Sequence, residues 1–121
     1  MSEKRVYIYD STLRDGAQTK GVDFSQADKL AIAAELDQIG IDYVEGGWPG
    51  ANPTDDSFFA MPPTFSRAKL CAFGMTRRLG RSAENDPGLQ AILAGGTDVI
   101  CLVGKTWDFH CLLYTSPSPR D

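Results

Sequence analysis

The chain begins its first structural unit with the stretch RVYIYDSTLRDGAQ, residues 5–18. Its first part, Arg5–Tyr9, is rich in β-branched and aromatic residues and predicts a strand. The polar part that follows contains glycine and predicts a loop. A helix should start after Ser25, which makes a capping-box pattern with Asp28, and should end at Gly40. The stretch therefore opens a strand–loop–helix unit.

The predicted helix has an apolar face. Ile32, Leu36 and Ile39 recur at i, i+4 and i+7, and Leu30 and Ala33 flank them. We expect this face to be buried.

The same alternation of strand and helix continues along the chain. Further strands are predicted at Ile41–Glu45, Lys69–Phe73 and Thr97–Val103, and further helices at Thr54–Met61 and from Pro87 to Ala94, the second capped by Asn85 or Asp86. Strand starts roughly 30 residues apart are typical of an α/β fold with parallel strands. The continuous apolar run of the last strand is expected where both faces of a parallel sheet are covered.

Two closures fit this alternation. One is a doubly wound open sheet, which can be complete at about this size. The other is the first half, about four βα units, of a (β/α)8 TIM barrel, which needs about 250 residues. The glycine-rich pyrophosphate turn is missing after the first predicted strand, which counts against a dinucleotide-binding sheet.

Composition and charge exclude several classes of protein. The 121 residues include 12 Lys or Arg and 16 Asp or Glu, which gives a net charge of -4, and 42% are hydrophobic. This balance is typical of one small globular domain and argues against a disordered chain or a nucleic-acid-binding protein. The sequence contains no run of 18 apolar residues and no secretory leader, so we expect no membrane association.

The cysteines favour a reduced, cytoplasmic protein. Cys71, Cys101 and Cys111 are widely spaced and form neither a CxxC pair nor a zinc pattern. Cys71 and Cys101 lie inside apolar runs, where a thiol usually behaves as a small buried hydrophobic group.

Chemically active side chains gather where the first predicted strand ends. Asp10, Arg14, Asp15 and Gln18 lie close together in the chain, and function in α/β folds concentrates at the carboxyl ends of strands. Asp15 or Asp10 could bind a divalent cation, with Arg14 facing the oxyanion that the metal also holds. The alternative is a polar turn capped by Asp10, with Arg14 and Asp15 solvated.

The other predicted strand ends carry weaker signals. Glu45 precedes two glycines, which would let a ligand approach the backbone, and it is either a catalytic group or a support for one. Trp48 either covers the site or packs in the core, and we favour packing. The cations of Thr76–Arg78 suit an acidic substrate or a salt-bridge network. His110 is a weak signal, because one histidine makes neither a metal site nor a triad.

Four strand-end stretches resemble one enzyme family. Residues 10–18 (DSTLRDGAQ) are similar to the signature loop of the metal-dependent Claisen-condensing TIM barrels, which include 2-isopropylmalate, homocitrate and citramalate synthases. Residues 43–55 (YVEGGWPGANPTD), 72–78 (AFGMTRR) and 104–110 (GKTWDFH) resemble the citramalate-forming subgroup. The resemblance runs from about Val6 to His110.

The resemblance implies a reaction and roles for particular residues. Members of the subgroup condense acetyl-CoA with pyruvate to give (R)-citramalate and CoA, a route into isoleucine, with the help of a divalent metal such as Mg, Mn or Zn. Asp15 corresponds to a metal ligand and Arg14 to a catalytic and substrate-binding residue. Gln18 and Glu45 correspond to substrate-binding residues. The complete enzymes are expected to be homodimers.

Important parts of the family's site are missing from the sequence. The resemblance implies a metal-binding His-x-His pair and a catalytic base, and neither is found here. We therefore expect residues 1–110 to be the N-terminal part of a catalytic barrel and inactive on their own. Residues 111–121, in which Pro117 and Pro119 exclude the helix that is due, are expected to be a spurious tail on a truncated chain.

Alternative functions stay open at this point. A sister synthase would use 2-oxoisovalerate or 2-oxoglutarate in place of pyruvate. A lyase would run the reverse carbon–carbon cleavage on the same barrel. A small complete α/β binding module would use residues 10–18 only as a loop.

Overall fold

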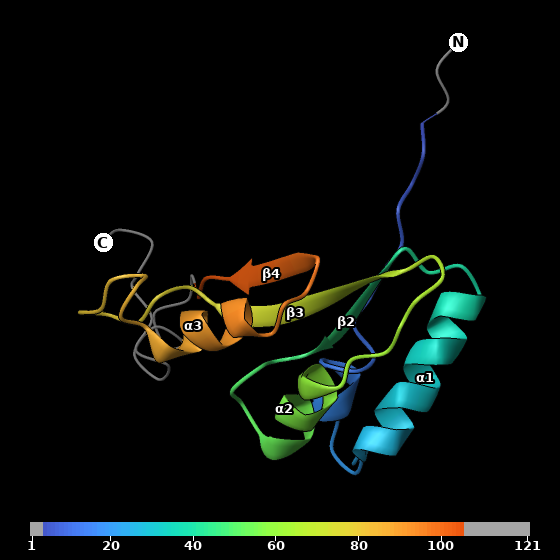
Figure 1. Ribbon diagram of the computed structural model, residues 1–121, viewed down its shortest axis with the longest axis horizontal. Helices are drawn as coiled ribbons and strands as arrows, with labels where there is room; N and C mark the ends of the chain where they lie inside the picture. Colours follow the sequence, from blue (N-terminus) through green and yellow to red (C-terminus); the bar gives the residue numbers. More distant parts are fainter. Residues whose placement is uncertain (1–3, 106–121) are drawn as a thin grey trace.

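The computed structural model describes residues 4–105, which form a parallel sheet with helices packed on it (Figure 1). In chain order the elements are β1 (Tyr9–Asp10), the 3-10 helix η1 (Gly16–Gln18), α1 (Gln26–Gln38), β2 (Tyr43–Gly47), α2 (Pro53–Ala60), β3 (Lys69–Met75), α3 (Pro87–Ala94) and β4 (Val99–Val103). The expectations for His110, Cys111 and the tail at 111–121 fall outside the described residues.

The order of the strands decides between the two predicted closures. Each strand pairs in parallel with its predecessor in the chain, so the sheet runs β1-β2-β3-β4. A doubly wound sheet reverses its order at a switch point, whereas a barrel adds each strand beside the last one. Figure 1 shows α1, α2 and α3 on one side of the sheet, as right-handed crossovers in one direction require. The predicted α/β half-barrel is confirmed for the described residues.

The first strand is shorter than predicted. Only Tyr9 and Asp10 pair with β2, and the side chains of Val6, Tyr7 and Ile8 are exposed. The carboxylate of Asp42 accepts a hydrogen bond from the Ile8 N–H at 2.8 Å, where a strand partner would otherwise contribute a carbonyl. β-Propensity marks residues suited to a strand, but a ladder needs a neighbouring backbone, and the described chain supplies one only from Ile8 onward.

The caps of α1 and α3 follow the predictions, with Asp86 chosen from the two candidates for α3. The hydroxyl of Ser25 accepts from the Asp28 N–H, and the Asp28 carboxylate accepts from the Ser25 N–H, so both halves of the capping box form. Gly40 has φ +96°, which suits glycine just beyond a helix end. Asp86 caps α3 by accepting from the Gly88 and Leu89 N–H groups. The bounds of β2, β3, β4 and α2 lie within two residues of the predicted ones.

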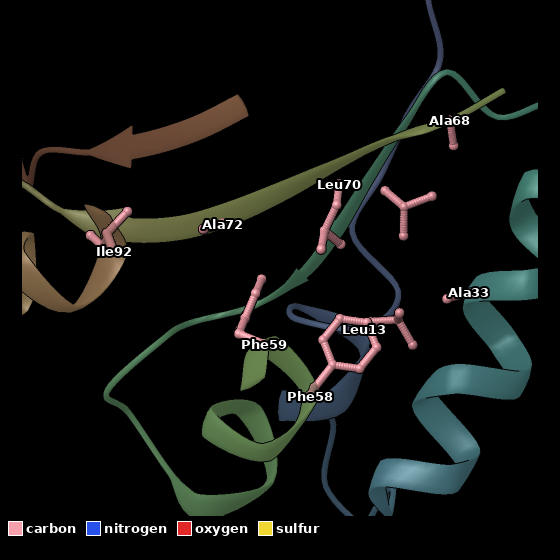
Figure 2. Close-up of a cluster of buried hydrophobic side chains, with 9 residues drawn as sticks. Leu13, Ala33, Phe58, Phe59, Ala68, Leu70, Ala72 and Ile92 are labelled. Carbon is pink, nitrogen blue, oxygen red and sulfur yellow. The ribbon is translucent and has the colours of Figure 1, made fainter. Parts of the chain in front are cut away.

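The hydrophobic core lies between the sheet and the helices. Figure 2 shows side chains from the loop after β1, from all three helices and from β3 converging there. The buried apolar cluster consists of Leu13, Ala33, Val44, Phe58, Phe59, Ala68, Leu70, Ala72 and Ile92. Because Leu13 is fully buried in this cluster, the core also anchors the polar loop at residues 10–18.

The buried face of α1 follows the prediction in part, since Ala33 is buried and Leu30 packs against the core. Lys29, Ala33 and Asp37 are its buried residues, while Ile39 is 71% exposed, so the expectation that Ile39 is buried was wrong. Ile32 and Leu36 pack against the edge of the core. Lys29 and Asp37 are buried as well because each finds a partner elsewhere in the chain, which hydrophobic spacing does not reveal.

Asp37 ties α1 to the start of β3. Its carboxylate accepts hydrogen bonds from the backbone N–H groups of Ser66, Arg67 and Ala68 at 2.8 to 2.9 Å. The bonds from Ala68 and then Ser66 hold the pKa of Asp37 below its ordinary value. The turn that leads into β3 is therefore held by one carboxylate.

Part of β4 is left uncovered by the described residues. Ile100 and Leu102 are 38% and 51% exposed, although the continuous apolar run of this strand is typical of one that is covered on both faces. Within residues 4–105 no helix follows β4 to pack over these side chains. In the same part of the chain, no helix has the length and hydropathy needed to span a membrane.

We predict that Gly74→Ala destabilises the sheet and that Ile92→Ala relieves most of the effect. A Cβ on Gly74 would lie 1.8 Å from Ile92 Cδ1 and 2.8 Å from its Cγ1. The single change should cost about 1–3 kcal/mol by overpacking, and Ile92→Ala alone about 2–5 kcal/mol. In urea unfolding, the double variant should lose clearly less than the sum of the two single losses. Gly16→Ala, where a Cβ meets ordinary contacts, is the control.

We predict that Asp37 makes stability depend on pH in acid. A carboxylate with a lowered folded pKa stabilises the fold above its unfolded pKa of about 4 and loses that contribution as pH falls through the folded value. Urea midpoints of the native chain should therefore exceed those of Asp37→Asn at neutral pH, and the gap should narrow in acid. Asp23→Asn, at an exposed position, controls for net charge. A gap that stays constant across this range would contradict the assignment.

Candidate functional site

The candidate site lies on the face of the sheet that points away from the helices. Val44 and Gly46 of β2 face the core, where a Cβ on Gly46 would meet Phe58 and Leu70. Because side chains alternate along a strand, Glu45 points to the opposite face. The β2–β3 register shifts between Glu45 and Gly47, and such a bulge often re-aims a side chain beside a site.

Glu45 is a buried carboxylate with two donors. Its side chain is 1% exposed. The Arg14 Nε–H donates to Oε1 at 2.5 Å, and the Tyr9 hydroxyl donates to Oε2. Both carboxylate oxygens are thus satisfied by groups from β1 and the loop behind it.

Arg14 is held on two sides. Its guanidinium carbon lies 4.0 Å from the centre of the Phe73 ring, within cation–π range, while Nε binds Glu45. Asp15 Oδ1 lies 3.6 Å from Nη1. With one edge and one face engaged, the guanidinium has a defined orientation before any ligand binds.

Trp48 packs against Phe73, the ring that contacts the Arg14 guanidinium. Its ring meets Phe73 edge to face, with centroids 5.2 Å apart and planes at 78°. Trp48 thus packs on an aromatic ring, as preferred, but neither ring belongs to the core cluster between the sheet and the helices. Sequence reasoning singled out neither Phe73 nor Tyr9 as a site residue. Phe73 lies in the stretch 72–78 that resembles the subgroup, whereas Tyr9 shows only aromatic character in a predicted strand.

Asp10 shapes the loop. Its carboxylate accepts from the Thr12 N–H at 2.9 Å and from the Thr12 hydroxyl at 3.0 Å. This is the capped turn that the sequence offered as an alternative to metal binding at Asp10.

Asp15 and Gln18 lie farther out than Arg14 and Glu45. The side chain of Asp15 is 68% exposed, and Gln18 ends η1 as an exposed residue. Among residues 4–105, no hydrogen bond or ion pair joins Gln18 to Arg14 or Glu45. The fold therefore joins Arg14 to Glu45 and places Asp15 beside Arg14, while Gln18 is an exposed residue of η1.

The described residues hold no complete metal site. Asp15 presents an exposed carboxylate beside Arg14, which suits one ligand of a hard divalent cation. Within residues 4–105, no group of three or more His, Cys, Asp or Glu side chains is arranged to hold a metal ion.

A cavity of about 580 Å³ adjoins Trp48 at the ends of β2 and β3. Met75, Thr76, Arg78 and Asp86 contribute to its lining. Asp86 accepts from the Arg78 N–H at 2.6 Å and so fixes the loop that carries this cation. Arg77 instead donates to the carbonyl of Arg81, so of the predicted cations only Arg78 lines the cavity.

Burial and Glu45 act together on neighbouring groups. Burial, followed by the hydrogen bond to Glu45 and its charge, raises the pKa of Tyr9 above its ordinary value. Burial, with the charge of Glu45 next, raises the pKa of the Cys71 thiol to about 12. Cys71 is fully buried, as predicted, whereas Cys101 is half-buried.

Comparison with known proteins identifies relatives. The HMGL-like family matches residues 5–73. The (R)-citramalate synthase of Aquifex aeolicus is 52% identical over 112 residues, which is 91% of this chain and 21% of the relative. That of Synechocystis is 50% identical over 109 residues, 88% of the chain and 20% of the relative. The 2-isopropylmalate synthase of Thiobacillus denitrificans is 33% identical over 114 residues, which is 93% of this chain and 20% of the relative. The chain spans about a fifth of the length of these relatives.

We predict that Glu45→Gln lowers the pKa of Tyr9 toward its ordinary value of about 10, without restoring it fully, because burial remains. A raised tyrosine pKa stabilises the fold below the unfolded pKa, and this contribution is lost as pH rises above about 10. An alkaline titration followed by tyrosinate absorbance measures the shift, with Tyr9→Phe to identify the signal. Tyr7→Phe, at an exposed neighbour, is the control. Identical titrations of the native chain and Glu45→Gln would refute the assignment.

Proposed function

Because the chain belongs to the HMGL-like family, we propose that it forms the amino-terminal part of the catalytic domain of an (R)-citramalate synthase. The observation that carries the proposal is 44–52% identity to five such synthases over 86–91% of the chain. The 2-isopropylmalate synthase of Thiobacillus denitrificans reaches 33% over a comparable span. We assign residues 1–110 to that domain and residues 111–121 to a tail foreign to it.

The proposed substrates are pyruvate and acetyl-CoA. A base would remove a proton from the methyl group of acetyl-CoA, and the resulting enolate would attack the keto carbon of pyruvate, whose oxygen would then be protonated. Water would hydrolyse the thioester and so release CoA. The complete protein is proposed to be a cytoplasmic homodimer.

Arg14 is the residue proposed to act on the 2-oxo acid. Its guanidinium would bind the substrate oxygens and stabilise the negative charge that develops on the carbonyl oxygen during attack. Glu45 and Phe73 fix the guanidinium in advance, so little reorganisation is needed when charge develops. Glu45 would thus serve the substrate through Arg14, and Gln18 would bind it from the rim by its amide.

A divalent metal is proposed to bind beside Arg14. Asp15 would supply one ligand, and the remaining ligands would come from parts of the protein outside residues 4–105. A bound Mg, Mn or Zn ion supplies Lewis-acid polarisation of a carbonyl. The part played by this chain is the carboxylate of Asp15, held 3.6 Å from Arg14.

A 2-isopropylmalate synthase is the second candidate. A stretch of 55 residues is 51% identical to the enzyme of Caldanaerobacter subterraneus, so the shared barrel leaves the choice of 2-oxo acid to a few pocket side chains. Substrate comparison separates the two candidates.

We predict that the full-length gene product carrying this sequence releases CoA thiol from acetyl-CoA when pyruvate is added. 2-Oxoisovalerate and 2-oxoglutarate should support at least tenfold less release. Arg14→Ala should lower kcat/KM by about 10²–10³-fold, since it removes a preorganised donor. Arg67→Ala, an exposed arginine at the opposite end of the sheet, should change it little.

The other 2-oxo acids give clear alternatives. Thiol release with 2-oxoisovalerate alone would replace the proposal with a 2-isopropylmalate synthase. Release with 2-oxoglutarate alone would point to a homocitrate synthase, and cleavage of citramalate without synthesis would point to a lyase.

A further inference from the structure

Two opposite charges are buried between α1 and α2. Lys29 is 1% exposed, and its Nζ lies 2.5 Å from Oδ1 of Asp55, whose side chain is 12% exposed. The ammonium also lies 5.1 Å from the centre of the Phe58 ring. Withdrawing both charges from water costs several kcal/mol per ion. Apolar residues of similar volume in their place often stabilise a fold as much as the ion pair does, or more. Stability alone therefore does not account for a charged pair here.

Asp55 connects this pair to the loop after β2. Its second oxygen, Oδ2, accepts a hydrogen bond from the backbone N–H of Trp48 at 2.9 Å. The N–H of Asp55 is itself held by Asn52 Oδ1 at 2.8 Å, so the carboxylate has a defined position at the start of α2. Lys29 holds one oxygen of the carboxylate and Trp48 the other.

The loop is shaped to fit the pair. Gly47 has φ +152°, and a Cβ there would lie 2.7 Å from Asp55 Cγ and 2.8 Å from Lys29 Nζ. Only a residue without a side chain lets the backbone pass this close. The backbone that leads into Trp48 therefore packs directly against the ion pair.

Trp48 transmits this placement to the candidate site. Its ring packs edge to face on Phe73 at 5.2 Å, and Phe73 lies 4.0 Å below the guanidinium carbon of Arg14. Contacts therefore run without a break from Lys29 through Asp55, Trp48 and Phe73 to Arg14.

We propose that Asp55 is a positioning residue for the Arg14 site, which it serves by fixing the Trp48 backbone so that its ring supports Phe73. Asp55 acts through Trp48 and not on the substrate itself. Lys29 compensates the buried charge at one oxygen of the carboxylate, and the other oxygen holds the Trp48 N–H. The consequence for catalysis rests on the proposed function, whereas the placement of Trp48 does not.

The test uses Trp48 as its own reporter. The chain has two tryptophans, so Trp107→Phe leaves Trp48 as the single fluorophore. In this background, Lys29→Met leaves a buried carboxylate without its partner. Lys29→Met with Asp55→Asn removes both charges but keeps an oxygen for the Trp48 N–H. Lys29→Met with Asp55→Leu removes both charges and that oxygen.

The two double variants separate positioning from simple stability. Lys29→Met/Asp55→Leu should show at least a twofold rise in acrylamide quenching of Trp48 and a red-shifted emission. Lys29→Met/Asp55→Asn should keep the parent values. If Lys29→Met fails to fold, this pair still decides the matter. Parent-like quenching in the Leu variant, or equal changes in both double variants, would overturn the proposal.

The full-length protein extends the test to catalysis. kcat/KM for pyruvate should fall about 10- to 100-fold in Lys29→Met/Asp55→Leu, as expected for a displaced catalytic group, and should recover in Lys29→Met/Asp55→Asn. Absence of synthase activity in the parent protein would refute the proposed function while the fluorescence result still judged the positioning role. If fluorescence shows that Trp48 is displaced in Lys29→Met/Asp55→Leu and both double variants still have the same kcat/KM, the link from Trp48 to Arg14 would be overturned.

Discussion

Glu45 imposes the constraint on which the site arrangement depends. Its carboxylate is almost completely buried on the face of the sheet opposite the helices, where an ionised group needs donors close by. Tyr9 and Arg14 are those donors, one from β1 and one from the loop behind it. Satisfying this carboxylate aligns the first strand and the 10–18 loop with β2. Leu13, buried in the core between them, anchors the same loop from the other side.

Two aromatic residues also help to hold the Arg14 guanidinium that the Glu45 carboxylate binds. Phe73 covers one face of the Arg14 guanidinium, and Trp48 braces Phe73 from the side. Three neighbouring parallel strands therefore supply the Arg14 guanidinium and its contacts: Arg14 follows β1, Glu45 lies in β2 and Phe73 in β3. They can do so because the carboxyl ends of the strands lie along one edge of the sheet. An arginine held in this way presents its remaining donors without first having to be ordered, which favours recognition of a small oxyanion.

Carboxylates also fasten the loops of this fold. Asp37 holds the turn before β3, Asp42 holds the approach to β1, and Asp86 holds the loop after β3, each by accepting backbone N–H groups. Loop N–H groups lack ladder partners, so a nearby carboxylate satisfies them at fixed geometry. This use of acidic residues explains why the buried face of α1 carries Asp37, while Lys29 on the same face is paired with the Asp55 carboxylate.

The sequence by itself determined the features that depend on near neighbours. The capping box at Ser25, the cap at Asp86 and the turn at Asp10 join residues two or three positions apart, so local chemistry suffices to predict them. Tertiary structure alone decided the short β1, the exposure of Ile39 and the pairing of Lys29 with Asp55. The contacts Lys29–Asp55, Arg14–Glu45 and Tyr9–Glu45 join residues 26, 31 and 36 positions apart. Such pairs form only after the strands have taken their order, because a charge or an aromatic ring is compatible with many partners until the fold brings one within reach.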